Sequence, residues 1–490
     1  MAEHRFALMA LALAAPLVLC AQAAVAASLP PESSFKGELA GDGKGGVVVR
    51  PFTTPEVQRD SGETQDAAPA QPRPQATRAR PQADARPQAE PEPQRGPAAG
   101  PVTLEVGAGR PIRTIAQAAK IARSGDTILV DSGVYAGDVA IFTQDQLTLR
   151  VRGGRARLNA SGAHAEGKAI WVVRGGHITV ENFEFVGARV PNHNGAGIRF
   201  EKGRLVLRNC LFRDNENGIL TSGNKEAELE IENSEFDRNG TVEGYGHQLY
   251  AGEIGALKVS GSYFHHAVGG HLLKSRAGRN IIMYNRLSDE AGGEASYEME
   301  FPSGGQSYVV GNLIEQGAST QNPAIVAAGL EGYRWPKNEL YLINNTIVDD
   351  RAAEGLFLRV APGMQIVRAM NNVLVGQGRH DLGIFTGDLK NPLRDTGGTA
   401  RLPDLAARTG EDGMKVEARN NYTVSRDAFM QAAQLDYRLR ERGALAGKYQ
   451  PPGMANGIEL APRAEYAHPA QSHRLAAEPT LPGAFQSAPR

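Results

Sequence analysis

Val180-Glu181-Asn182-Phe183, Leu207-Arg208-Asn209-Cys210 and Ile231-Glu232-Asn233-Ser234 are three copies of one short pattern. In each copy, a segment that alternates apolar and polar residues reaches an Asn and continues for a few strand-like residues. The pattern returns, once with Gly in the place of Asn, at Gly261, Asn285, Asn312, Asn345 and Asn372. The intervals run from 24 to 33 residues, so the middle of the chain is a sequence repeat.

The repeat predicts a solenoid of short strands. Its period is too short for pairs of helices, and its alternation by two is typical of strands. Leucine-rich repeats share the period and the Asn, but the dense leucine scaffold that they need is missing. We therefore expect a parallel β-helix with about 4.8 Å between coils. The recurring Asn tolerates a left-handed turn, and its amide can bond the same amide one coil away.

The beginning of the repeat region fits this fold. Thr114 can cap a short helix that runs to about Ala122 and plugs the open apolar end of the first coil. Ser124-Gly125-Asp126-Thr127 then turns into a strand at Ile128-Leu129-Val130. This opening resembles that of the right-handed parallel β-helix (pectin-lyase-like) superfamily, and the resemblance covers residues 101–450. It implies an all-β solenoid fold but no single activity, because that fold carries lyases, hydrolases, epimerases and inert spikes.

The two ends of the chain differ in composition from the repeat region. Residues 1–26 read as a signal peptide, with Arg5, an apolar run and a small-residue cleavage site at Ala24-Val25-Ala26. Lipid attachment at Cys20 is an alternative. Residues 27–100, in which Arg-Pro-Gln-Ala recurs, are expected to be a disordered spacer, and residues 451–490 a loosely ordered tail. We expect an exported monomer, periplasmic or extracellular, without a transmembrane segment.

Composition excludes several classes of function. The chain has 53 Lys and Arg against 54 Asp and Glu, which argues against nucleic-acid binding through bulk positive charge. Two Cys residues supply neither a disulfide scaffold nor a cysteine-ligated zinc site. No phosphate loop, nucleotide fingerprint or Gly-x-Ser-x-Gly elbow occurs.

Three consecutive repeats place candidate side chains on one strand face. Gly246-His247-Gln248-Leu249-Tyr250 and Gly270-His271-Leu272-Leu273-Lys274 match at a spacing of 24 residues, and Tyr297-Glu298-Met299-Glu300 follows. Strict alternation then buries Leu249, Leu273 and Met299. It turns outward Gln248, Tyr250, Leu272, Lys274, Glu298 and Glu300.

Other basic residues join this face. Arg276 continues it beyond Ser275, and an earlier coil puts Arg199 in the column of Tyr250. His247 and His271 are expected to stack at the adjoining turn. Successive members of a column lie about 5 Å apart.

Such an array suits β-elimination beside a uronate carboxylate. This reaction needs a base for a weakly acidic C–H, a cation that stabilises the enolate, and an acid for the leaving oxygen. We predict Lys274 as the base and Arg276 or Arg199 as the group that holds the carboxylate. The candidates for the acid are Tyr250, His247 and His271. Glu300 opposes this assignment, because a neighbouring carboxylate raises the pKa of a lysine.

The segments Leu273-Lys274-Ser275, Tyr284-Asn285 and Val310-Gly311-Asn312, with Asn280 and Gly304-Gly305 between them, resemble the polysaccharide-lyase family of alginate lyases and chondroitinase B. The resemblance implies Lys274 as the catalytic base. The position of that family's catalytic Arg is occupied by Glu300. Its acidic calcium ligands are replaced by Gly269-Gly270-His271-Leu272. We therefore predict no metal and no cofactor, with calcium as the open alternative.

Other interpretations of the same residues remain. Gln248, Glu298 and Glu300 are predicted to contact substrate, and so are three residues of the loop Glu331–Pro336: Tyr333, Arg334 and Trp335. That loop sits in the longest repeat interval and either folds over the groove or simply packs. His265-His266 is expected to be a turn, with metal binding as the alternative.

The leading hypothesis is a lyase, or an epimerase, that acts on an acidic polysaccharide. One alternative is a non-catalytic β-helix that binds glycans or serves the cell envelope. Another is a glycoside hydrolase, because Glu298 and Glu300 lie two apart on one strand, roughly 7 Å between Cα atoms.

Overall fold

The computed structural model describes residues 100–241, 245–320, 322–353, 355–376, 399–409, 413–434, 436–440 and 442–487. The predicted signal peptide, 1–26, and the predicted spacer, 27–100, lie outside this range except for Gly100. Within the described residues, none of the helices is long and apolar enough to cross a bilayer.

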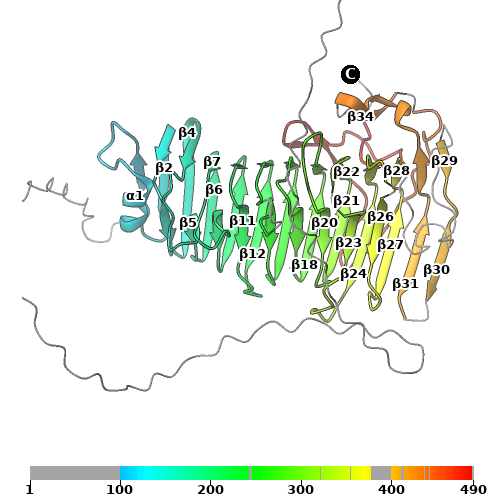
Figure 1. The fold of residues 1–490 in the computed structure, drawn as a ribbon, viewed down its shortest axis with the longest axis horizontal. Helices are drawn as coiled ribbons and strands as arrows, with labels where there is room; N and C mark the ends of the chain where they lie inside the picture. The colour runs from blue at the N-terminus through cyan, green and yellow to red at the C-terminus, as the bar shows by residue number, and fades with distance from the viewer. Residues whose placement is uncertain are drawn as a thin grey trace, which may run out of the picture. The chain divides into compact units, whose positions relative to one another are not determined.

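The repeat region winds into a parallel β-helix, as predicted (Figure 1). Every strand of a nine-stranded sheet pairs in parallel with the corresponding strand of the neighbouring coils. The strands of this sheet, in chain order, are β3 (Ala140–Phe142), β5 (Ala169–Val173), β8 (Ala196–Phe200), β11 (Asn217–Thr221), β14 (Leu249–Ala251), β17 (His271–Ser275), β20 (Tyr297–Phe301), β23 (Ala324–Ala328) and β26 (Leu356–Val360).

A second sheet forms the other two walls of the solenoid. The strands of its first wall are β1 (Thr103–Val106), β2 (Thr127–Ala136), β4 (Gln146–Asn159), β6 (His177–Glu181), β9 (Arg204–Arg208), β12 (Glu228–Glu232), β15 (Ala256–Ser260), β18 (Arg279–Met283), β21 (Gln306–Val310), β24 (Glu339–Ile343), β27 (Ile366–Met370) and β31 (Lys415–Arg419). Those of the second wall are β7 (Phe183–Val186), β10 (Leu211–Arg213), β13 (Glu235–Asp237), β16 (Tyr263–His265), β19 (Arg286–Ser288), β22 (Leu313–Gln316), β25 (Thr346–Asp349), β28 (Val373–Val375) and β32 (Tyr422–Val424). Two further strands, β29 (Thr399–Arg401) and β30 (Leu405–Thr409), pair antiparallel with β32 and β31.

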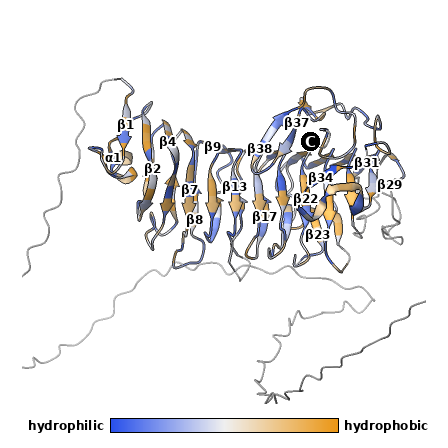
Figure 2. Cartoon of the chain, turned by 90° about the horizontal axis from the view of Figure 1, so that it is seen from above, coloured by the Kyte–Doolittle hydropathy of each residue, from blue (hydrophilic) through white to orange (hydrophobic). Residues whose placement is uncertain are grey.

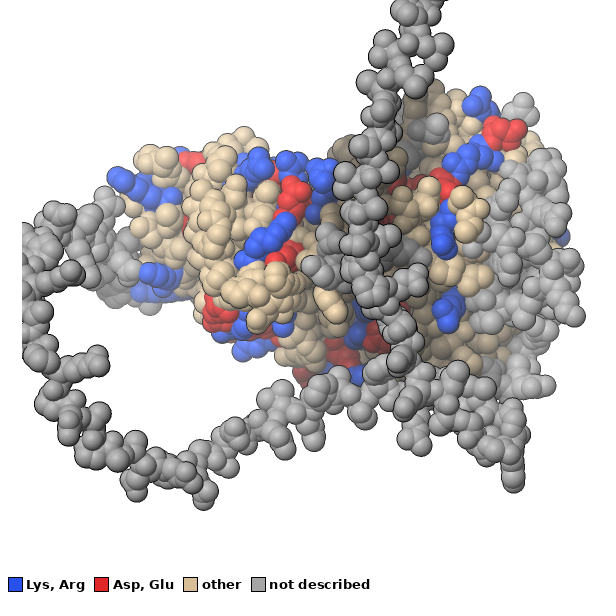
Figure 3. Space-filling view, in the orientation of Figure 1, with Lys and Arg blue, Asp and Glu red and all other residues tan. Residues whose placement is uncertain are grey.

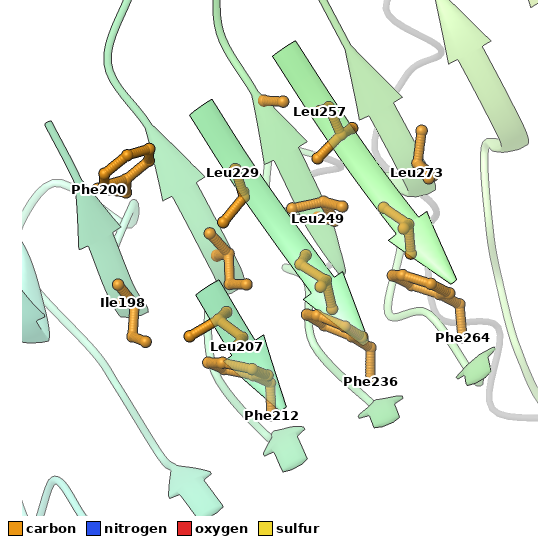
Figure 4. Packing of buried hydrophobic residues seen from close by; sticks show 14 of the residues in the cluster. Ile198, Phe200, Leu207, Phe212, Leu229, Phe236, Leu249, Leu257, Phe264 and Leu273 are labelled. Carbon is orange, nitrogen blue, oxygen red and sulfur yellow. The ribbon is translucent and has the colours of Figure 1, made fainter. Parts of the chain in front are cut away.

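The core is built by equivalent residues of successive coils. Phe185, Phe212, Phe236 and Phe264 stack in a row, with ring centroids 4.9, 4.9 and 4.4 Å apart. Figure 4 shows the rings of Phe212, Phe236 and Phe264 in a row across successive coils, near leucines of the adjacent strands. Hydropathy alternates along the strands in Figure 2, as the sequence pattern requires.

The turn between the two walls of the second sheet holds two separate polar columns. One is left-handed: Asn182, Asn209, Asn233, Gly261, Tyr284, Gly311, Asn344, Asn371 and Asn420 all have φ between 49° and 68°. The residues that follow form an interior ladder, in which the side chain of each residue after the first accepts the backbone N–H of the equivalent residue one coil earlier. Its members, in order, are Cys210, Ser234, Ser262, Asn285, Asn312, Asn345, Asn372 and Asn421. From Asn285 onward the side-chain amides also bond one another. The prediction that the recurring Asn takes a left-handed turn and bonds the Asn one coil away is confirmed for Asn182 and Asn209, at 2.6 Å. The predicted single column is wrong, because the repeat shifts by one residue between Gly261 and Asn285, so that its later members belong to the interior ladder.

The first coil is closed by a helix, as predicted. Helix α1 (Ile115–Ile121) begins with a capping box between Thr114 and Gln117, and it buries Ile115, Ala118 and Ala119 against the end of the core. Asp138 accepts the backbone N–H groups of Ile115 and Ala116, at 2.6 and 2.8 Å.

The C-terminal segment is packed on the solenoid, and the expectation of a loosely ordered tail over 451–490 is wrong. Its elements are η1 (Arg426–Ala428), β33 (Phe429–Gln431), η2 (Ala432–Gln434), β34 (Asp436–Leu439), β35 (Met454–Ala455), β36 (Ile458–Glu459), β37 (Ala464–Ala467) and β38 (Gln471–Arg474). Leu460 and Leu481 are buried, and the carbonyls of Leu481 and Gly483 accept hydrogen bonds from Asn344. Composition alone does not show this, because the apolar anchors are sparse among Pro and Ala.

Candidate active site

The nine-stranded sheet brings the predicted residues into one outward column. Tyr250 on β14 is the register partner of Lys274 on β17, and Lys274 is the partner of Glu300 on β20. Arg199 on β8 pairs with Leu220 on β11, which in turn pairs with Tyr250. The shared outward face of Tyr250, Lys274 and Glu300 is therefore confirmed, and Arg199 lies two coils away.

An open pocket of about 480 Å³ lies on this face. We call it the cationic pocket. Its lining residues are Asn194, Arg199, Asn217, Leu220, Thr221, Ser222, Gly223, Tyr245, His247, Tyr250, Gly252, Glu253 and Arg276. The guanidinium of Arg276 lies 5.4 Å from the centroid of the Tyr250 ring. Arg199 and Arg276, which are far apart in the sequence, thus meet at one hollow.

Both guanidinium groups keep an unused donor. Nε of Arg199 and Nη1 of Arg276 are buried and have no hydrogen-bond partner. Burial lowers the pKa of Arg199, against the opposing effects of Glu201 and Tyr250. Buried donors of this kind favour an anion that would satisfy them.

Lys274 borders the pocket and is held in an ion-pair network. Its Nζ lies 3.2 Å from Oε2 of Glu300 and 3.0 Å from Oε1 of Glu331, and the side chain is only 12% exposed. Glu331 also forms an ion pair with Arg276. The Glu331 carboxylate thus bridges Lys274 and Arg276, the residues predicted to act in β-elimination.

His247 and His271 meet at the start of their strands, as predicted, but edge to face rather than in a parallel stack. Their ring centroids are 4.7 Å apart, and the backbone N–H of His271 donates to Nδ1 of His247 at 3.0 Å. The His247 ring lies parallel to Tyr250, at 5.4 Å. Burial, together with the charges of His271, Lys274 and Arg276, holds the pKa of His247 well below its ordinary value. His247 is therefore a neutral hydrogen-bonding group at neutral pH.

His271 is coupled to the column through Glu300. Its Nε2 lies 2.8 Å from Oε2 of Glu300, the oxygen that also faces Lys274. Burial lowers the pKa of His271, although Glu300 opposes the shift. Burial raises the pKa of Glu300, but His271 and Lys274 outweigh it, so this pKa lies below its ordinary value. Glu300 is thus an ionised carboxylate that orients two neighbours.

The loop Glu331–Pro336 reaches back over the strand ends, and its aromatic rings are packed. Nε1 of Trp335 donates to the carbonyl of Arg276 at 2.9 Å, and the ring lies against Gly278. Tyr333 donates to the carbonyl of Ala361 and packs on the core. Arg334 pairs with Glu253 of the pocket at 2.8 Å. The packing supports the structural interpretation of Tyr333 and Trp335, whereas Glu331 and Arg334 reach the site.

Three side chains do not point where strict alternation puts them. Gln248, Leu272 and Glu298 are fully buried. Gln248 donates to the carbonyl of His265 at 2.5 Å, Leu272 belongs to the core, and Glu298 accepts from Thr320 at 3.0 Å. His271 and Lys274, three positions apart, both contact Glu300, so this strand departs from strict alternation. The predicted outward orientation of all three is therefore wrong.

This orientation contradicts the glycosidase alternative. Glu298 is fully buried, and burial raises the pKa of Glu298 well above its ordinary value, with Asp289 adding to the shift. Two carboxylates that flank a glycosidic bond must both reach it. Glu298 does not reach the groove.

Calcium, which the resembling family implies, does not fit these residues. A calcium ion takes six to eight oxygen ligands. Gly269 and Gly270 supply no side-chain oxygen, and the carboxylates nearest to Lys274 are already paired with cations. No step is therefore assigned to calcium.

Sequence reasoning missed three residues of the site. Glu253 lines the pocket, Asn217 accepts the backbone N–H of His247 at 3.0 Å, and exposed Arg359 on β26 continues the outward column past Ala327. Aligning the strand positions of one more coil in the sequence would have found Arg359. The positions of Glu253 and Asn217 in the site depend on turn geometry, which the sequence repeat does not predict.

Comparison with known proteins bears on the fold. A family model described as "Right handed beta helix region" matches residues 117–286. Among solved structures, pectate lyase Pel9A matches with a TM-score of 0.45 and 15% identity, over 80% of this chain and 97% of that chain. No curated protein matches.

Proposed function

Because this chain is a right-handed parallel β-helix, the fold of the pectin-lyase-like superfamily, with two cations at an open pocket, we propose that it binds an acidic polysaccharide and cleaves it by β-elimination. The observation that carries the proposal is the meeting of Arg199 and Arg276, each with a buried unused donor, beside Tyr250 and Lys274. Export by the predicted signal peptide would bring the enzyme to such polymers.

Recognition begins with the uronate carboxylate. A guanidinium binds a carboxylate through short charge-assisted hydrogen bonds, and the unused N–H groups of Arg199 and Arg276 are available for them. In Figure 3 acidic and basic side chains are intermixed over the described part of the visible face. Selectivity for an anionic sugar therefore belongs to the pocket and not to the charge of the whole surface.

The elimination step uses neighbouring groups of the outward column. Lys274, as the free amine, takes the proton from C5, and the electron pair of that C–H bond forms the C4–C5 double bond. The C4–O bond breaks, and the leaving oxygen takes a proton from Tyr250. The arginine that holds the carboxylate stabilises the negative charge that builds up in the enolate.

In the absence of substrate, Glu331 occupies the position that the sugar carboxylate needs. Its carboxylate pairs with both Lys274 and Arg276, which is where the sugar carboxylate is needed. Displacement of Glu331 by the substrate frees Lys274 and Arg276, which already lines the pocket, to contact the sugar.

The test is an elimination assay on the full chain with alginate, pectate and glycosaminoglycans. Elimination gives an unsaturated product that absorbs in the ultraviolet, and we expect this signal with at least one polymer. Lys274→Ala should lower the rate by about 10²–10⁴-fold, the usual contribution of a positioned base. Exposed Arg150 lies on β4 of the other sheet, so Arg150→Gln is the control and should leave the rate unchanged. An unchanged rate in Lys274→Ala would remove Lys274 from the mechanism.

A second candidate function is binding without cleavage, and the pairing of Lys274 favours it. Buried Glu300 and the more exposed Glu331 both pair with the ammonium group, as expected for a structural lysine. Saturable binding of an acidic oligosaccharide without an ultraviolet signal would support this candidate. An increase in reducing ends without that signal would instead indicate hydrolysis and contradict both.

A further inference from the structure

A second cluster of side chains lies away from the cationic pocket, at the turn after β16. Asp237 ends β13, and His265, its register partner one coil on, ends β16. His266 follows with φ of 49°, which swings its ring back toward the same point. Nδ1 of His265 lies 2.7 Å from Nδ1 of His266. Oδ1 of Asp237 lies 3.4 and 3.3 Å from these two nitrogens.

Each of the three side chains also has a charged neighbour on the side that faces away from the cluster. Nε2 of His265 lies 3.2 Å from Oε1 of Glu235, and Nε2 of His266 lies 3.8 Å from Oε2 of Glu290. An ionised carboxylate only accepts, so the hydrogen bond to Glu235 favours a proton on Nε2 of His265 and leaves its Nδ1 with a lone pair. The negative charge of Glu290, at 3.8 Å, favours the same tautomer of His266. Arg238 pairs with the other oxygen of Asp237.

Three lone-pair atoms therefore converge on one point. At a separation of 2.7 Å, two unprotonated imidazole nitrogens repel each other unless a cation lies between them. Ligands about 2.0–2.1 Å from a tetrahedral zinc ion lie roughly 3.3 Å from one another, which matches the two distances from Asp237, 3.4 and 3.3 Å. The two histidine nitrogens lie closer together, at 2.7 Å. The outer carboxylates match the partners that commonly orient metal-bound histidines.

We propose that Asp237, His265 and His266 bind one divalent transition-metal ion of the zinc type. Imidazole nitrogen suits zinc, nickel or copper, whereas calcium prefers oxygen alone. Asp237 and His265 are buried and the His266 side chain is 28% exposed, so the site is accessible from one side. Three protein ligands leave a fourth position for water or an added ligand.

The site ties neighbouring coils together at a point that leads into the candidate active site. Asp237 belongs to one coil and the histidines to the next, and the turn after His266 runs directly into His271 and Lys274 of β17. The carbonyl of His265 also accepts the side chain of Gln248, at 2.5 Å. A bound ion would therefore fix this turn and stabilise the fold, whatever the reaction in the pocket.

The experiment uses full-length protein without an added histidine tag, stripped with a chelator and titrated calorimetrically with Zn²⁺ alone. We expect one tightly bound equivalent, a higher melting temperature with Zn²⁺, and the visible absorption of tetrahedral Co²⁺ on substitution. His266→Ala should abolish the tight equivalent, and Glu235→Gln should weaken binding by about 10–100-fold. His193 is 76% exposed and outside the cluster, so His193→Ala is the control.

Two results would overturn the proposal. One is the absence of tight Zn²⁺ binding to the wild-type chain, which would mean that a shared proton alone joins the two histidines. The other is binding that is equally tight in His266→Ala and Glu235→Gln. Because Glu235 is an outer partner, its variant gives an answer even where His266→Ala fails to fold.

Discussion

At the scale of single residues, Glu331 decides how the cationic pocket meets an anion. It neutralises Lys274 and Arg276 in the free protein, so an acidic sugar must compete with it. Its side chain is 41% exposed, and an exposed ion pair of this kind contributes little to stability. The loop carboxylate therefore acts on binding more than on folding.

Glu331→Gln is predicted to tighten the binding of an acidic oligosaccharide by several-fold. The variant removes the competing charge while it keeps the shape of the side chain. Calorimetric titration at low salt measures the effect, since salt screens it. Exposed Glu294 lies outside the pocket, so Glu294→Gln serves as the control. Weaker binding in Glu331→Gln would show that Glu331 contacts the ligand directly.

Asp289 is predicted to make stability depend on pH. Burial raises its pKa to about 7, only partly offset by the backbone N–H groups of Ala295 and Ala267, and Glu315 adds to the rise. The unfolded value is about 3.9. A raised carboxyl pKa means that the folded state holds the proton more tightly, so this stability is lost as pH rises from about 4 to 7.

The variant Asp289→Asn should remove this dependence. We expect the free energy of unfolding of the variant, relative to that of the wild type, to increase steadily from pH 4 to pH 7. Denaturant titration at each pH is the measurement. Glu298 and Glu315 also have pKa values raised by burial, but they are present in both proteins and contribute to both curves. A difference that stays constant with pH would contradict the assignment.

At the scale of elements, the turn ladder is what holds one coil on the next. Asn345 donates to the carbonyl of Val309 and to Asn372, and it accepts from the backbone and side chain of Asn312. All these groups are buried. In the earlier coils Ser234 and Ser262 make the equivalent bonds with a hydroxyl, so the ladder needs a polar acceptor and not an amide as such.

Asn345→Ala is therefore predicted to lower the free energy of unfolding by about 3 kcal/mol or more, because several buried groups lose their partners at about 1–3 kcal/mol each. Cys210→Ser is the matched change. Serine at position 210 can bond as Ser234 and Ser262 do, so we expect a change within about 1 kcal/mol. Denaturant titration of both variants is the measurement. Equal losses in the two would contradict the ladder account.

The sequence allowed much of this to be predicted, and the failures have clear causes. The period identified the solenoid and aligned Tyr250, Lys274 and Glu300, because equivalent strand positions share a face. Gln248 and Glu298 were misplaced because the chain departs from strict alternation where these strands begin: Gln248 precedes β14, and both side chains are fully buried. The pairing of Asp237 with His265 was missed because it depends on register in a different sheet.

At the scale of the whole described unit, the C-terminal segment is part of the fold. Tyr308, Tyr341 and Met370 on the outer face of the second sheet pack with Leu460 and Ala455. Tyr284 accepts the backbone N–H of Arg463 at 2.8 Å. The segment thus covers apolar surface that the solenoid leaves open.

Truncation after residue 450 is predicted to lower the melting temperature by several degrees and to expose apolar surface. We expect these effects because truncation removes buried contacts, although the segment lies at the end of the chain. Binding of a hydrophobic dye and thermal unfolding followed by circular dichroism report the two effects. A truncated chain that melts at the wild-type temperature without binding dye would show that the segment is dispensable.

The central claim is that winding of the chain brings Arg199 and Arg276 to one site for an acidic sugar. Its most direct test is calorimetric binding of galacturonate, mannuronate–guluronate and glucuronate-containing oligosaccharides to Arg199→Gln, Arg276→Gln and the double variant. Hydrogen bonds to charged groups contribute about 1.5–3 kcal/mol each, so either single change should weaken the best ligand about tenfold to hundredfold. The two effects should not simply add. Wild-type affinity in both single variants would contradict the claim.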